Sequence, residues 1–154
     1  MLSYSKRNLY KQLVIEQQPV YVFVHALHHQ CCLVLHSSIV PQFSGLCVDN
    51  TVSVEAINVS ARVAHKHAQA ISDLGGDLVA LDWEFSLIAP FVGYCMYVSA
   101  SIHIVFLFSQ NSALAVLAKT RLVSNLKVLG VLKGYWSNLE RLVRIIPHRC
   151  PNLY

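Results

Sequence analysis

The chain has 154 residues and a formal net charge of +4, from 12 Lys and Arg against 8 Asp and Glu. Charged residues make up 13% of it and hydrophobic residues 55%, whereas an average soluble domain has about 25% charged residues. The length predicts one domain or one piece of a larger one. The basic residues are scattered, which excludes the basic stripe typical of nucleic-acid binding. So few charges would coat a free-standing domain poorly, and we expect more chain, a partner or lipid to cover part of the surface.

Cysteine usage indicates the redox compartment. The five cysteines are Cys31, Cys32, Cys47, Cys95 and Cys150. Their odd number and the lack of a Cys-x-x-Cys pair favour reduced thiols in an intracellular protein over a disulfide framework. The first 24 residues do not form a signal peptide, because charged residues from Lys6 to Glu16 interrupt them.

The N-terminal third predicts one helix and one loop. Residues 1–18 are polar and form a lead-in or the end of a truncated helix. Pro19 can open the next helix, because proline is tolerated in a first turn, and helical spacing of apolar residues continues to Leu35. Residues 37–50 are rich in turn-forming residues and predict a loop.

A second helix is expected in the middle of the chain. Thr51 or Ser53 can cap its start. Its apolar residues recur at helical spacing as far as Leu74. Gly75-Gly76 predicts its end, because glycine commonly follows the last turn of a helix.

The stretch from Phe85 to Gln110 contains no charged residue. Pro90 predicts the first turn of a helix that runs to Ser109, and about 20 apolar residues can cross a bilayer. Serines and His103 in the middle of the run favour a helix covered by other helices, because polar groups are costly in hydrocarbon. Gly93 and Ala100 share a face where a neighbouring helix could approach closely.

Two further helices complete the pattern. Asn111 or Ser112 can cap the first of them, and Trp136 begins the second, which Pro147 ends. We therefore expect an all-α protein, an antiparallel bundle of about five helices at 19–147, followed by a frayed tail at 148–154.

Histidines and cysteines gather in one part of the first predicted helix. On a helix His28, Cys32 and His36 are spaced by four residues and share one face, so they are the candidate metal ligands. A fourth ligand would have to come from elsewhere, such as His65 or His67, which are two residues apart and would point to different sides of a helix. Because this set is not closed, a structural role for the histidines and thiols is favoured over metal binding.

The sequence offers no candidate catalytic residue. There is no Gly-x-Ser-x-Gly elbow, no phosphate-binding glycine loop and no pair of acids placed for acid–base work. We therefore expect a protein that is not an enzyme. His103 is expected to be a core histidine bonded to a backbone or serine oxygen, and Trp83 and Trp136 are expected to be packing residues.

Four stretches carry a resemblance to a known family. They are His25–Phe43, Ala61–Ile71, Trp83–Phe106 and Asn125–Trp136. In order and spacing they resemble the middle homology region, which is the regulatory region of fungal zinc-cluster transcription factors. The sequence departs from the family pattern at Gln30, which two histidines and two cysteines flank, and at Ser37-Ser38, where many members have arginine and proline.

The resemblance implies an all-α regulatory region without shared catalytic residues, within a nuclear transcription factor. Such proteins normally carry an N-terminal six-cysteine, two-zinc cluster that binds DNA, and this chain has none. The resemblance therefore implies that zinc belongs only to a missing N-terminal cluster and that the chain makes no direct DNA contact. It also implies that the chain is the incomplete C-terminal half of a larger regulatory domain. The expected partners are the missing N-terminal part, other transcription proteins and a small-molecule effector.

Two alternatives to a regulatory fragment stay open at the level of sequence. One is a small single-pass membrane protein anchored by residues 90–109. The other is a helical metal-binding protein that uses His28, Cys32 and His36.

Overall fold

The computed structural model describes the backbone of residues 4–45, 52–80 and 83–149, and the side chains of residues 17–45, 52–80 and 83–145. Within these residues the chain forms six α-helices and two short 3₁₀ turns, and no strand. In chain order the elements are α1 (Tyr4–Ser37), α2 (Pro41–Ser44), α3 (Val54–Ala80), η1 (Phe85–Leu87), α4 (Pro90–Leu107), α5 (Ser112–Leu132), η2 (Ser137–Leu139) and α6 (Glu140–Arg149). The prediction of an all-α bundle is confirmed.

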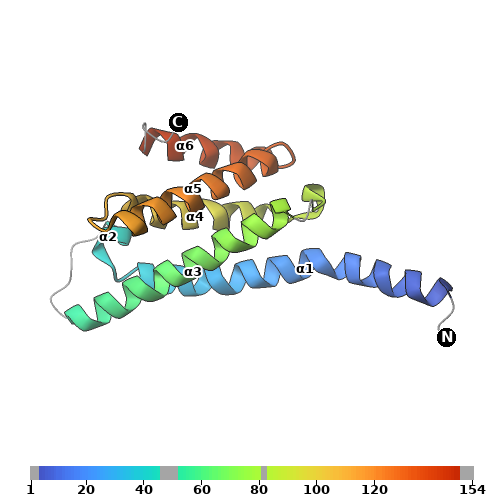
Figure 1. The fold of residues 1–154 in the computed structure, drawn as a ribbon, viewed down its shortest axis with the longest axis horizontal. Coiled ribbons are helices and arrows are strands. Elements are labelled where there is room, and N and C mark those ends of the chain that lie inside the picture. The colour runs from blue at the N-terminus through green and yellow to red at the C-terminus, as the bar shows by residue number, and fades with distance from the viewer. Residues whose placement is uncertain (1–3, 46–51, 81–82, 150–154) are drawn as a thin grey trace.

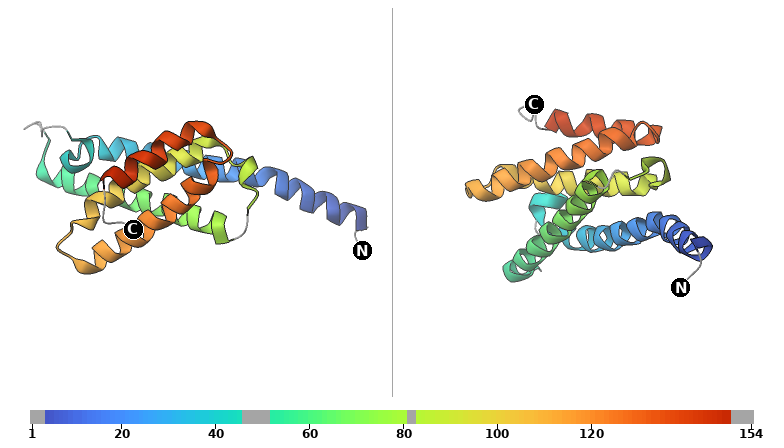
Figure 2. Two further views of the ribbon diagram at one scale, coloured as in Figure 1. Left: turned by 90° about the horizontal axis from the view of Figure 1, so that it is seen from above. Right: turned by 45° about the vertical axis from the view of Figure 1, so that its right-hand side comes forward.

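Helix α4 is the centre of the bundle, because it contacts α1, α2, α3, α5 and α6. Helices α1 and α3 pack against each other on one side of α4, and α5 and α6 follow on the other side (Figure 2, right). The N-terminal part of α1 projects beyond the other helices in every view (Figures 1 and 2). This arrangement explains how a helix as apolar as α4 is covered by protein.

The burial of α4 confirms its predicted place inside a bundle. Its side chains Val92, Cys95, Met96 and Ala100 are fully buried, and so is the polar His103. Within the described residues α4 is also the one helix long and apolar enough to cross a membrane, with 44% of that window buried. Core helices of soluble proteins meet the same criterion, so this property does not favour the membrane alternative.

Local signals for helix starts are confirmed at two places. Pro90 occupies the first turn of α4, where its missing N–H leaves no helical hydrogen bond unmade. The Asn111 side chain accepts hydrogen bonds from the backbone N–H groups of Ala113 and Leu114, and so caps α5.

The end of the α4–α5 pair opposite Asn111 is closed by residues that follow α5. The indole Nε1 of Trp136 donates a hydrogen bond to the carbonyl oxygen of Ile88, at 2.9 Å. Leu139 packs so closely on Gly93 that a Cβ added there would lie 2.5 Å from Leu139 Cδ1. The predicted close approach at Gly93 is therefore confirmed, although the neighbour is η2 and not a long helix.

The prediction that Pro19 opens a helix is wrong, because α1 runs through it from Tyr4 to Ser37. A proline inside a helix removes one backbone hydrogen bond and its ring crowds the preceding turn, and this commonly bends the helix. Helix α1 is visibly bent along its length (Figure 1). Its first residues therefore extend the helix instead of leading into it.

The prediction that Gly75-Gly76 ends the second helix is also wrong, because α3 continues to Ala80. A Cβ added at Gly75 would lie 2.8 Å from Met96 Sδ and 3.3 Å from Val128 Cγ2. Gly75 thus lies where Met96 of α4 and Val128 of α5 pack directly against the backbone of α3. Close packing of the neighbouring helices, and not the end of a helix, explains the glycine at this position.

Two smaller expectations also change. Residues 41–44 of the predicted loop form the short helix α2, and α6 passes Pro147 to end at Arg149. On α5, Leu114 and Leu117 are exposed although they are apolar. The expected cap at Thr51 and the part of the tail from residue 150 lie outside the described residues.

Candidate functional site: a histidine cluster between α1 and α3

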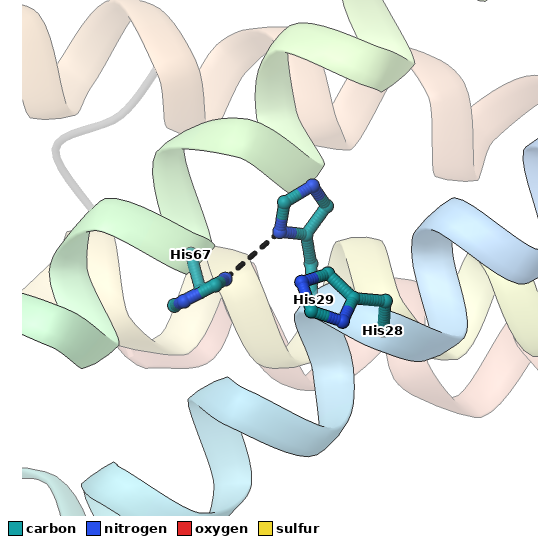
Figure 3. A group of neighbouring side chains, drawn as sticks. All are labelled: His28, His29 and His67. Carbon is teal, nitrogen blue, oxygen red and sulfur yellow. Dashed lines mark hydrogen bonds between the residues drawn. The ribbon is translucent and has the colours of Figure 1, made fainter.

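Three histidines from two helices come together on the side of the bundle formed by α1 and α3. His28 and His29 are on α1 and His67 is on α3. One ring nitrogen from each of the three histidines lies within 4.8 Å of the corresponding nitrogens of the other two. Figure 3 shows the rings turned toward a common point. The packing of α1 against α3 creates this cluster, which neither helix contains alone.

A direct hydrogen bond joins the two helices inside the cluster. His29 Nδ1 and His67 Nδ1 are 2.8 Å apart (Figure 3). One of these rings therefore carries its hydrogen on Nδ1 and donates it, and the other accepts. His28 completes the group, with ring centroids 5.1 Å from His29 and 5.8 Å from His67.

The environment disfavours the protonated form of His29 and of His67. His29 and His67 are half-buried, whereas His28 is exposed. Partial burial lowers the pKa of His29, and repulsion from the neighbouring histidines lowers this pKa further. Burial also lowers the pKa of His67, with His28 and Lys66 adding to the effect. Neutral imidazoles have a free lone pair, which is the form that binds metal ions.

The predicted ligand set is only partly brought together. His28 lies in the cluster, and His67 joins it as one of the two suggested outside ligands. Cys32 is half-buried on α1 but not in the group, and His36 Nδ1 is instead 3.2 Å from Ser60 Oγ. His65 points elsewhere and stacks on Phe106 with ring centroids 3.9 Å apart.

Sequence reasoning did not select His29 as a ligand. The residue was visible within the run of histidines, but helical spacing of four favoured its neighbours on another face. Only the register of α1 on α3, which brings residue 29 opposite residue 67, singles it out. A contact between two residues that are 38 positions apart in the sequence leaves no pattern within either helix.

A second polar cluster lies in the core, between α3, α4 and α5. His103 Nε2 is 2.9 Å from Ser72 Oγ, which is 3.0 Å from Ser99 Oγ. Ser99 donates to the Ala68 carbonyl and accepts from Asn125 Nδ2. The prediction that His103 is a core histidine bonded to a serine or backbone oxygen is confirmed.

This core cluster is sealed from solvent. Ser72, Ser99, His103 and Asn125 are all buried, and burial lowers the pKa of His103 to about 3. The ring is therefore neutral at physiological pH. A serine beside a neutral histidine is an arrangement that some hydrolases use, but these side chains are buried. Their hydrogen bonds link α3, α4 and α5, although His103 Nδ1 and Asn125 Oδ1 have no partner among the described residues.

The cysteines do not fit a six-cysteine zinc cluster. The chain has five cysteines in all. Among the described residues Cys31 is exposed, Cys32 is half-buried and Cys95 is fully buried. The Cys95 thiol lies 3.8 Å from the carbonyl oxygen of Ala26, and burial raises its pKa to about 12. Such a thiol is a packing group and neither a thiolate ligand nor a nucleophile.

Comparison with known proteins gives several partial similarities, all to one class. The chain is 34% identical over 65 residues to the Zn(2)-C6 fungal-type transcription factor FTF1c of Fusarium oxysporum f. sp. lycopersici. It is 39% identical over 54 residues to FTF1a and 36% identical over 55 residues to FTF2 of the same fungus. Part of this chain is similar to fungal zinc-cluster transcription factors.

These similarities cover 35–42% of this chain and 5–7% of the relatives' own length. The relatives are named as transcription factors and not as enzymes. No family model matches the chain, and no solved structure matches it. The similarity of part of this chain to a short segment of much longer transcription factors therefore supports a role in transcription regulation at the level of protein class.

Proposed function

We propose that this chain is a non-catalytic part of the regulatory region of a fungal zinc-cluster transcription factor. It acts in the nucleus through contacts with other parts of that regulator, with other transcription proteins or with an effector. The similarity to FTF1c over 65 residues is the observation that carries this proposal. The DNA-binding zinc cluster, and with it direct DNA contact, would belong to a part of the regulator that these residues do not include.

An exposed apolar stripe on α1 supports a role in protein contacts. Val20, Val24, Leu27 and Leu35 follow one another at helical spacing and are exposed, Leu35 at 70%. The opposite face of the same helix is already buried against the bundle, through Ala26 and other core residues. A helix that is apolar on both faces needs a second covering surface, and other parts of a multi-domain regulator would provide one.

A tethered reporter assay tests the proposal. The chain is fused to an unrelated DNA-binding domain in a fungal cell, and transcription from a reporter is compared with that given by the DNA-binding domain alone. We expect the fusion to raise or lower transcription at least threefold. No difference from the DNA-binding domain alone would contradict a regulatory role.

A pair of matched variants then tests whether the α1 stripe makes the contacts. Leu35→Lys changes the stripe, and Val116→Lys changes an equally exposed apolar residue on α5, at 70% and 67% exposure respectively. We expect Leu35→Lys to abolish the effect on transcription and Val116→Lys to leave it unchanged. Equal effects of the two variants would argue against α1 as the contact surface.

A further inference from the structure

The cluster of His28, His29 and His67 has the composition of a transition-metal site. Three imidazoles converge, and no carboxylate is in the group. Imidazole nitrogen suits Zn²⁺, Cu²⁺ and Ni²⁺, whereas Ca²⁺ and Mg²⁺ require oxygen ligands. Sites with three protein ligands and an open fourth position are common for zinc.

The spacing of the nitrogens also fits such an ion. Zinc–nitrogen bonds of about 2.0–2.1 Å in tetrahedral geometry place two ligand nitrogens about 3.3 Å apart. The Nδ1 atoms of His29 and His67 are 2.8 Å apart, and all three ligand atoms lie within 4.8 Å of one another. The required separation lies above the 2.8 Å contact and below the 4.8 Å limit. An ion bound through both Nδ1 atoms would replace the hydrogen bond between them, and the ring that now donates would carry its hydrogen on Nε2 instead.

The protein surroundings leave the rings available to a metal ion. His29 and His67 are bonded only to each other by the hydrogen bonds found among the described side chains. The exposed position of His28 gives solvent access to the group. Among the described side chains, the charged neighbours that act on His29 and His67 are bases and not acids.

We propose that His28, His29 and His67 bind one divalent transition-metal ion, with Zn²⁺ as the best fit, and that this ion links α1 to α3. This site goes beyond the proposed regulatory function, and it shares only His28 with the predicted set of His28, Cys32 and His36. The ion binds only when the two helices are in register, so metal binding stabilises the packing of α1 on α3.

Calorimetric titration of the metal-free full chain with Zn²⁺ tests the proposal directly. We expect one ion per chain, and a rise in Tm of about 5–10 °C when Zn²⁺ is present at 100 times its dissociation constant. Titration with Co²⁺ as a second probe is expected to give the visible absorption of a four-coordinate site, which has three histidines and an open fourth position. Absence of binding by both ions would overturn the proposal.

Variants identify the ligands and separate the two histidine sets. We expect His29→Gln and His67→Gln each to weaken Zn²⁺ binding at least tenfold, because glutamine keeps the size and a hydrogen bond but not the imidazole. The matched control is His36→Gln on the same helix, which is bonded to Ser60 outside the cluster and should change binding less than twofold. Circular dichroism confirms that each variant folds.

The opposite pattern would overturn the assignment. Loss of binding in His36→Gln or Cys32→Ala, with His29→Gln unaffected, would assign the metal to the set predicted from helical spacing. If His67→Gln fails to fold, His29→Gln and His28→Gln still decide the question, because both lie on the accessible side of α1. Retention of binding by both of them would exclude the cluster.

Discussion

The molecule uses histidine in two opposite ways on the two sides of α3. On one side His67 meets His28 and His29 in a partly exposed cluster of bases that repel one another when protonated. On the other side Ser72 meets His103 in a sealed network that keeps the ring neutral. The comparison shows that surroundings, and not residue type, decide whether a histidine is available for binding or fixed in the core.

Acid should lower the free energy of unfolding mainly through the sealed network around His103. In the unfolded chain the pKa of His103 is near its ordinary value of 6.5, whereas burial in the folded chain lowers this pKa to about 3. As pH falls below 6.5 the unfolded state binds more protons, so the free energy of unfolding decreases by about 1.4 kcal/mol per pH unit, or about 3 kcal/mol by pH 4.

Urea unfolding at pH 7, 5.5 and 4 measures this effect. Other histidines with lowered pKa, including His65 and His67, contribute to the total, so the variant His103→Leu serves as the reference. The pH dependence of the wild type should exceed that of His103→Leu. Identical slopes would show that His103 titrates normally and that the network is open to water.

Breaking the network at its central hydroxyl should have the next largest effect. Ser99→Ala removes the donor to the Ala68 carbonyl and leaves the Asn125 amide without its partner. An unsatisfied buried polar group costs about 1–3 kcal/mol. Ser101→Ala on the same helix is the control, because the one hydrogen bond of the Ser101 hydroxyl among the described residues goes to the Tyr97 carbonyl one turn back.

Chemical denaturation compares the two serine variants. We expect Ser99→Ala to lose about 2 kcal/mol of unfolding free energy and Ser101→Ala less than about 0.5 kcal/mol. Equal losses would mean that Ser99 matters only through its own helix and that the network contributes no additional stability.

The close packing of α3 against α4 and α5 should depend on Gly75. Gly75→Ala places a methyl group 2.8 Å from Met96 Sδ, and the overpacking should outweigh the gain in helix propensity, for a net loss of about 1 kcal/mol. Gly76→Ala meets only Ser124 Oγ, at 3.9 Å, and should stabilise the protein by up to about 1 kcal/mol. Thermal melts of the two variants that shift in the same direction would contradict this account.

The smallest effect should come from the open cluster in the absence of metal. His29→Gln keeps a hydrogen-bonding partner for His67 and removes one of the repelling bases. We therefore expect a change of less than about 0.5 kcal/mol in the unfolding free energy of the metal-free chain. A loss comparable to that of Ser99→Ala would show that the cluster is a structural network and would end the contrast between the two sides.

Sequence alone predicted the features that have a local cause. Pro90 in a first turn and Asn111 at a cap follow from backbone hydrogen bonding within four residues, and both are confirmed. The serines and His103 within the uncharged stretch of α4 also predicted that other helices, and not lipid, cover it. The core role of His103 followed from the same reasoning.

The errors arose where tertiary contacts override a local rule. Pro19 is a helix-start signal in isolation but lies inside α1, and Gly75 is a helix-stop signal but lies inside α3, where Met96 packs against it. The pairing of His29 with His67 depends on the register of two helices. No spacing rule along one helix reports that register.

The bond between Trp136 and Ile88 has a consequence for how the protein opens. It joins the chain just before α4 to the chain just after α5, while Asn111 holds the turn between these two helices. The α4–α5 hairpin is thus fastened at both ends, whereas the N-terminal part of α1 projects freely (Figure 1). Backbone amides of α4 and α5 should therefore exchange with solvent deuterium last, and local opening should begin at α1 and leave the hairpin as the residual folded unit.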